Sequence, residues 1–120
     1  MAGEGNHLRY GMPLARDILD RLRAGRSPTG RELADAMCIE EWRVAPGAET
    51  APYLLEGKVA GRSTSEVVIA LDPAVGWART FDRWFVLGEP DPNSKPLVSP
   101  DGVMQATAAW IDRQLDDESR

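Results

Sequence analysis

The clearest strand signal in the chain is EVVIALD at residues 66–72, followed by PAVG at 73–76 and WARTFDRWFVL at 77–87. Residues 67–71 are all apolar, and three of the five are β-branched. Such a run is typical of a strand that is buried on both faces. The Asp, Pro and Gly of residues 72–76 favour a turn. We therefore expect a central strand over 66–72 and a neighbouring strand after the turn.

Residues 77–87 combine aromatic, apolar and arginine side chains. They form either one long strand bent at Asp82, which we favour, or two short strands hinged at that residue. Successive side chains of a strand point to opposite faces, so Trp77, Arg79 and Arg83 would share one face and Trp84 would lie on the other. Tryptophan and arginine are enriched among the residues that dominate binding energy at protein interfaces. We therefore take as candidate binding residues Arg79, Arg83, Trp84 and Trp77.

A structural role for the same four side chains is the competing interpretation. In that case Trp77 and Trp84 pack beneath helices, and the two arginines stack on aromatic rings of the same chain as cation–π pairs. The two interpretations predict different exposure for the tryptophans, and the sequence alone leaves both open.

The segments on either side supply the remaining elements. Strand patterns at 42–44 and 53–60 extend the sheet over residues 42–88, and Gly57 and Gly61 fall where a bulge or a close backbone crossing is expected.

Apolar residues at helical spacing after Pro13, and the capping-box pattern Thr29 to Glu32, predict a pair of helices within residues 12–37. Residues 89–98 are a proline-rich linker, and a last helix follows over 99–117, with Ser99 as its N-cap. Residues 1–11 contain three glycines and no periodicity, so we expect a loose arm.

These elements predict an α+β fold in a single domain of 120 residues. Two N-terminal helices precede an antiparallel sheet of four or five strands, either open or closed into a partial barrel. The C-terminal helix packs on that sheet.

The charge of the chain is acidic: 14 Lys and Arg residues stand against 19 Asp and Glu, a net charge of −5. This balance gives no general attraction to nucleic acid or to an anionic membrane, and we expect neither as a partner. The basic residues concentrate near the first helix and the acidic residues near the last, so we expect these helices to attract each other. The lack of a long apolar run or a leader-like N-terminus favours a cytoplasmic location.

Residue types that carry catalysis or bind metal are scarce. The sequence has one histidine, His7, and one cysteine, Cys38, which follows Met37 on what we expect to be the apolar side of the second helix. A lone cysteine there is usually a small buried apolar residue. We find no nucleophile–histidine arrangement, no zinc ligand set and no phosphate-binding loop, and we predict no catalytic residues, no metal site and no cofactor.

Part of the chain resembles a family of small uncharacterised proteins from alphaproteobacteria. The similarity covers about residues 14–88 and rests on a G-x-V-x-G strand, here GKVAG at 57–61, and on WART at 77–80 followed by RWFVLG at 83–88. Asp82 and Phe85 stand where that family has serine and tyrosine. The resemblance implies a helical N-terminal part before a sheet, and it implies an accessory or mobile-element-encoded protein without a known activity.

Two functions follow as hypotheses. The first is a non-enzymatic protein-interaction module, of the kind that serves as an accessory regulator or an anti-defence inhibitor, whose partner is another protein and which is also compatible with a homo-oligomer. The alternative is a small-molecule or nucleotide-binding protein that uses a sheet pocket with Arg62, Ser63 and Arg79.

Overall fold

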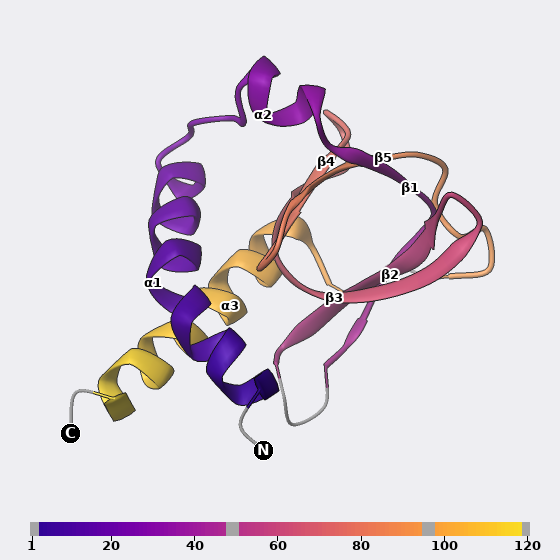
Figure 1. The fold of residues 1–120 in the computed structure, drawn as a ribbon. Helices are drawn as coiled ribbons and strands as arrows, with labels where there is room; N and C mark the ends of the chain where they lie inside the picture. Colours follow the sequence, from indigo (N-terminus) through magenta and orange to yellow (C-terminus); the bar gives the residue numbers. More distant parts are fainter. Residues whose placement is uncertain (1–2, 48–50, 95–97, 119–120) are drawn as a thin grey trace.

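The computed structural model describes residues 3–47, 51–94 and 98–118, in which three helices and five strands form an α+β fold (Figure 1). The helices are α1 (Gly3–Arg23), α2 (Gly30–Ala34) and α3 (Pro100–Glu118). The strands are β1 (Met37–Pro46), β2 (Tyr53–Val59), β3 (Arg62–Asp72), β4 (Trp77–Thr80) and β5 (Trp84–Leu87). The predicted order, with two N-terminal helices, a sheet and a C-terminal helix packed on it, is confirmed.

The sheet closes into a barrel in the order β1-β2-β3-β4-β5. The four pairs of consecutive strands are antiparallel, whereas the closing pair of β1 and β5 is parallel. This follows from the number of strands: when five consecutive strands alternate in direction, the first and the fifth point the same way. The predicted antiparallel sheet that curls into a barrel is confirmed, and the closing pair differs only in being parallel.

Strand β3 is the central strand, as the apolar run at 67–71 predicts. Its first half, up to Val67, pairs with β2, and its second half, from Val68, pairs with β4. Strand β1 bends in the same way, because Met37 to Ile39 pair with β5 and the residues from Glu40 onward pair with β2. Strands β1 and β3 are the two longest strands, and each pairs with a different neighbour along each half of its length. This arrangement lets the sheet close into a barrel.

Residues 77–87 form two short strands hinged at the turn, which is the second of the two predicted alternatives and not the favoured single strand. Two short strands flank a turn at 81–83, in which the Thr80 backbone N–H donates to the Arg83 carbonyl over 2.9 Å. The buried Thr80 hydroxyl accepts from the backbone N–H groups of Asp82 and Arg83, each over 3.3 Å. These bonds satisfy the amides of the turn, and the chain reverses where a continuous strand would have run on.

The glycines of the G-x-V-x-G strand lie at tight positions, as expected. A Cβ on Gly57 would lie 2.7 Å from Cγ1 of Ile39 and 2.8 Å from the carbonyl oxygen of Glu40, so strands β1 and β2 approach too closely there for a side chain. Gly61 has φ of +81° in the turn between β2 and β3. Such a backbone conformation strongly favours glycine.

Two separate apolar cores hold the fold together. One fills the barrel from all five strands and is completed by α3; it contains Ile39, Leu55, Val68, Leu71, Ala78, Phe85 and Val103. The other lies between the outer face of the barrel and the helices, and it contains Met12, Ala15, Leu19, Leu22, Ala51, Ile69, Ala70, Trp77, Trp84, Ala108, Trp110 and Ile111. Strand β5 contributes to both, because Trp84 and Phe85 point to opposite faces.

Helices α1 and α3 lie together against the barrel, and the predicted attraction between them is confirmed by an ion pair of Arg16 with Asp112 (Figure 1). Two details differ from expectation. Helix α1 begins at Gly3, so residues 3–11 are helical where we expected a loose arm, and Pro13 lies within the helix. Leu14 is exposed, while Met12 takes a place in the core. The glycines of the first eleven residues conceal this helix, because they lower helix propensity and break the apolar period.

Helix α2 is shorter than predicted, although its start is as predicted. Both bonds of the capping box are present: Glu32 N–H donates to the Thr29 hydroxyl over 3.0 Å, and Thr29 N–H donates to the Glu32 carboxylate over 2.9 Å. The helix ends at Ala34, and Met37 and Cys38 begin β1 with exposed side chains. The prediction that these two residues continue the apolar face of a helix is wrong.

Within the described ranges, no helix has the length and apolar character needed to cross a membrane.

The capping box gives stability a pH dependence. The hydrogen bond from the Thr29 backbone, followed by the bond from Arg21, holds the pKa of Glu32 below its usual value of 4.5. A carboxyl group whose pKa is lowered on folding stabilises the fold above its unfolded-state pKa and loses this effect as the pH falls through the folded-state pKa. We expect Glu32→Gln to be less stable than wild type by about 0.5–1 kcal/mol at pH 7.

Urea unfolding of both proteins at a series of pH values between 7 and 2 tests this expectation. The two free energies of unfolding should converge below pH 4.5, as the wild-type carboxylate takes up its proton. A difference that stays constant from pH 7 to pH 2 would show that the charge of Glu32 has no part in it.

Candidate binding surface

Three of the four candidate binding residues are buried. Trp77, Trp84 and Arg79 have exposed fractions of 5%, 8% and 9%, and both tryptophans belong to the core beneath the helices. The two indole rings meet edge to face, with centroids 5.8 Å apart. These positions agree with the structural interpretation of the tryptophans, and of the four side chains only Arg83 is exposed.

Arg79 is a largely buried cation. Its guanidinium lies 5.3 Å from the centroid of the Trp84 ring, and its Nη2 donates to the Phe81 carbonyl over a long 3.5 Å. Its Nε has no hydrogen-bond partner, and the ion pairs among the described residues do not include it. Burial lowers the pKa of Arg79 from its usual value, which the nearby Glu32 carboxylate partly offsets. Contact with the Trp84 ring, together with the nearby Glu32 and Asp82 carboxylates, compensates in part for the lost hydration of Arg79.

Arg83 is exposed and yet fixed in place. Its Nε pairs with the Glu66 carboxylate over 3.3 Å, and Glu66 is itself held by the Thr80 hydroxyl, which donates over 2.8 Å. Its guanidinium lies 5.7 Å from the Phe85 ring centroid, and Nη1 lies 3.7 Å from Sδ of Met37. An arginine with contacts on three sides has few rotamers left to lose when a partner binds.

Arg79 and Arg83 line one pocket together with Trp84. The pocket measures about 500 Å³ and lies between α2, the start of β1 and the turn between β4 and β5; its other lining residues are Glu32, Asp35, Ala36, Met37 and Asp82. Met37 is 48% exposed at its edge. The fold thus brings three of the four predicted residues to one pocket, although two of them lie largely beneath its surface. We call this site the arginine pocket.

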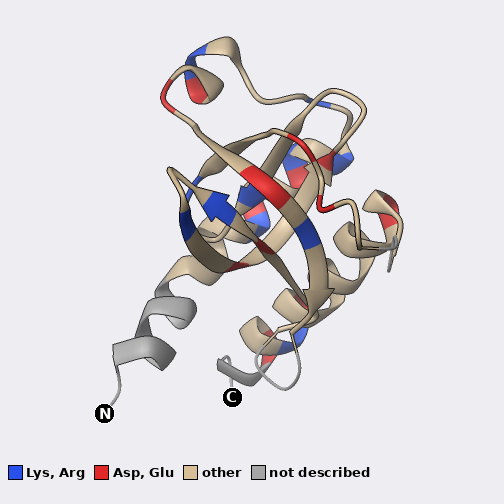
Figure 2. Ribbon diagram, turned by 90° about the vertical axis from the view of Figure 1, so that its right-hand side faces the viewer, with Lys and Arg blue, Asp and Glu red and all other residues tan. Residues whose placement is uncertain are grey.

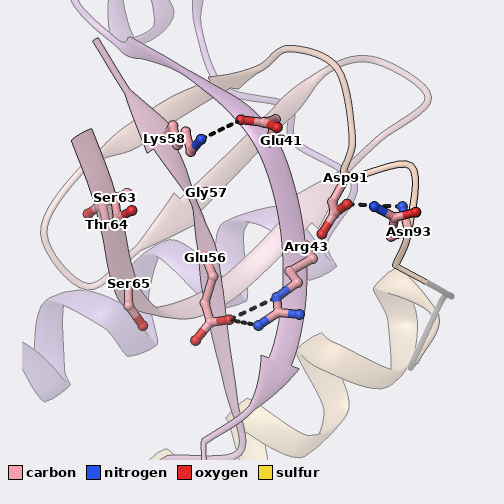
Figure 3. Close-up of a pocket in the computed structure, with 10 residues that line it drawn as sticks. All are labelled: Glu41, Arg43, Glu56, Gly57, Lys58, Ser63, Thr64, Ser65, Asp91 and Asn93. Carbon is pink, nitrogen blue, oxygen red and sulfur yellow. Dashed lines mark hydrogen bonds and ion pairs between the residues drawn. The ribbon is translucent and has the colours of Figure 1, made fainter. Parts of the chain in front are cut away.

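The residues of the alternative hypothesis do not meet. Ser63 lines a pocket on β1, β2 and β3, whereas Arg79 lines the arginine pocket, and Arg62 lines neither. In the pocket of Ser63 the charges pair with one another: Lys58 with Glu41 over 3.0 Å, and Arg43 with Glu56 over 2.9 Å (Figure 3). Figure 2 shows the same mixture of basic and acidic residues on the strands of the barrel. This face of the sheet is a set of exposed cross-strand pairs.

The sequence did not predict a further pocket, which lies beside Trp42. It is a groove of about 480 Å³ lined by Trp42, Arg43, Val44, Leu71, Pro73, Pro90, Asp91, Pro92, Ser94, Val98 and Pro100. The Trp42 indole N–H donates to the Gly88 carbonyl over 3.0 Å and so fixes the ring in the groove. Its residues come from four separate stretches of the chain, so no local pattern could have revealed it.

Cys38 is exposed, and partial loss of hydration at its thiol, together with the neighbouring Glu40 carboxylate, raises the pKa of Cys38. A raised pKa lowers the thiolate fraction and with it the reactivity of the cysteine. Within the described residues, no cluster of three or more His, Cys, Asp and Glu side chains is arranged to hold a metal ion.

Comparisons with protein-family models, with curated proteins and with solved structures found no match to this chain.

Proposed function

We propose that this protein is a non-enzymatic interaction module that binds another protein at the edge of the arginine pocket. The observation that carries the proposal is Arg83, an exposed arginine held by Glu66, Phe85 and Met37 at the opening of a pocket of about 500 Å³. Arginine is among the residues enriched at binding hot spots.

The surroundings of Arg83 support a contact with protein. Met37 offers an exposed, flexible apolar side chain next to the guanidinium, and methionine adapts readily to a partner's surface. Trp84 and Arg79 stiffen the floor of the pocket from below. Because the site is built on strands, a partner would meet a preformed surface. The proposal includes the role of an accessory or mobile-element-encoded regulator or anti-defence inhibitor in the cytoplasm, as the resemblance and the composition suggest.

Replacement of Arg83 by alanine tests the proposal. We expect the variant to bind its partner about 1–4 kcal/mol more weakly, because it removes the charged centre of the surface. We expect the free energy of unfolding to fall by only about 1–2 kcal/mol, because Glu66 is 12% exposed but keeps its hydrogen bond from the Thr80 hydroxyl when the ion pair is removed. Affinity capture from the native host with quantitative mass spectrometry identifies the partner, and calorimetry with the purified partner measures the loss.

Arg31→Ala provides the matched control. Arg31 is an exposed arginine on α2 that does not line the arginine pocket, so its replacement should leave capture and affinity unchanged. Equal losses in both variants would indicate a general effect of charge. Wild-type affinity in Arg83→Ala would place the binding surface elsewhere on the molecule.

A further inference from the structure

We propose that the groove beside Trp42 receives an extended segment of a partner protein, which adds as a short strand to the open edge of β1 at Val44 and places a basic side chain near Asp91. This inference adds a second docking element to the proposed interaction function. It rests on three independent observations: backbone groups that face away from the sheet, a preformed apolar groove next to them, and an acidic side chain at its rim.

The backbone of β1 is open at Val44. The Gly47 N–H bonds to the Pro52 carbonyl, so the hydrogen-bonded pairs with β2 fall at Gly47, Ala45 and Arg43. Hydrogen-bonded and non-bonded pairs alternate in an antiparallel ladder, which directs the N–H and C=O of Val44 away from β2. No hydrogen bond outside the strand ladders joins Val44 to another described residue.

The chain itself uses this edge one position earlier. After β5 the backbone runs alongside β1, where Pro90 forms an isolated parallel bridge with Trp42 and the Asp91 N–H donates to the Trp42 carbonyl over 2.9 Å. The register shift of β1 between Glu40 and Arg43, with Glu41 at φ of +50°, turns the bonding groups of Trp42 to this side. Trp42 and Val44 then face the same way, because alternate residues of a strand do.

The groove lies directly against that edge, since Trp42 and Val44 both line it. Its other walls include Leu71, Val98 and prolines, whose fixed φ keeps a surface rigid. Unpaired backbone donors and acceptors beside an apolar groove match an extended polypeptide: its main chain bonds the edge, and alternate side chains enter the groove. Pro46 lacks an N–H and ends the edge, so the added strand is short.

The charge at the rim favours a basic segment. Arg43 and Asp91 line both this groove and the pocket of Figure 3, so the two lie next to each other. Arg43 pairs with Glu56, whereas the Asp91 carboxylate accepts only the Asn93 backbone N–H over 3.0 Å among the contacts of the described residues. The net charge of −5 adds a general attraction for cations. A Lys or Arg of the incoming segment would complete the pairing of Asp91.

Amide hydrogen exchange with a defined probe tests the proposal. The probe is the capped peptide Ac-Lys-Val-Thr-Val-Arg-amide, and its matched control replaces Lys and Arg by Glu. In the free protein we expect the Val44 amide to exchange rapidly, and saturating basic peptide should slow it about tenfold or more. The acidic peptide should bind at least threefold more weakly. A Val44 amide that is already protected in the free protein, or that the basic peptide leaves unchanged, would overturn the proposal.

Two variants complete the design. Val44→Pro removes the outward N–H and no bond of the β1–β2 ladder, and it should lower peptide affinity at least tenfold. Asp91→Asn should remove the preference for the basic peptide, whereas Asp17→Asn, on the exposed side of α1, should keep it. If Val44→Pro does not fold, the Asp91 pair still decides; an unchanged preference in Asp91→Asn contradicts the inference.

The same peptide bound to Arg83→Ala separates this inference from the proposed function. Retained peptide binding with lost partner capture would assign partner recognition to the arginine pocket and leave the edge site valid. Failure of the peptide on wild type, with partner capture still dependent on Arg83, would overturn the edge site alone.

Discussion

Replacing Trp84 by alanine is expected to lower the free energy of unfolding by about 3–5 kcal/mol, because it empties the centre of the core between the helices and the barrel. Trp84 is 8% exposed and meets the edge of Trp77. The guanidiniums of Arg79 and Arg21 lie 5.3 and 5.8 Å from its ring centroid. The substitution therefore removes apolar contact and also one of the contacts that compensate the burial of Arg79.

Urea unfolding followed by circular dichroism measures this effect, with Val75→Ala as the control. Val75 is 68% exposed in the turn before β4, and its truncation should change stability by less than about 0.5 kcal/mol. A cost below about 1 kcal/mol for Trp84→Ala would mean that the ring is dispensable for packing, and it would restore Trp84 as a residue kept for binding.

The contrast between Trp84 and Arg83 shows what the sequence could not decide. Both residues fit the pattern of a binding strand, and their neighbours in sequence are equally apolar. What separates them is the turn at 81–83: it sets Trp84 opposite Arg79 on the face that the helices cover and leaves Arg83 at the turn itself. The Thr80 hydroxyl that helps to form this turn looks like any other strand threonine in the sequence.

Local signals predicted the elements best. The capping box at Thr29 and the N-cap at Ser99 are present as predicted, and the Ser99 hydroxyl accepts the Gly102 N–H over 3.0 Å. These motifs succeed because all the partners lie within four residues. Met37 and Cys38 were assigned to a helix because they follow an apolar helical pattern, whereas pairing with Phe85 and Val86 places them in β1. That pairing joins residues almost fifty positions apart.

The groove beside Trp42 and the open edge at Val44 were beyond local prediction for the same reason. The groove depends on the bulge at Glu41 and on the path of the chain after β5, and both are consequences of closing the barrel. The sequence did predict a sheet able to curl into a barrel. It could not supply the register that leaves one residue of β1 with its backbone groups pointing outward.

The second large effect is expected from Phe85→Ala, which should cost about 3–5 kcal/mol by opening a cavity inside the barrel. Phe85 is 1% exposed and is the largest of the fully buried side chains, at the centre of a core separate from that of Trp84. The neighbouring Val86→Ala is the matched control on the same strand: Val86 is 36% exposed, so its truncation should cost less than about 1 kcal/mol.

A domain of this size has about 5–15 kcal/mol of stability in total, so each of the two core variants uses a large share of it. Trp84 and Phe85 occupy different cores but are adjacent on β5, so their costs need not add strictly; we expect the double variant to be less stable than either single variant and to unfold at a lower urea concentration. Urea unfolding followed by circular dichroism would show this directly. A cost for Phe85→Ala no greater than that of Val86→Ala would contradict a packed barrel interior and place the stability of the protein in the helix–barrel core alone.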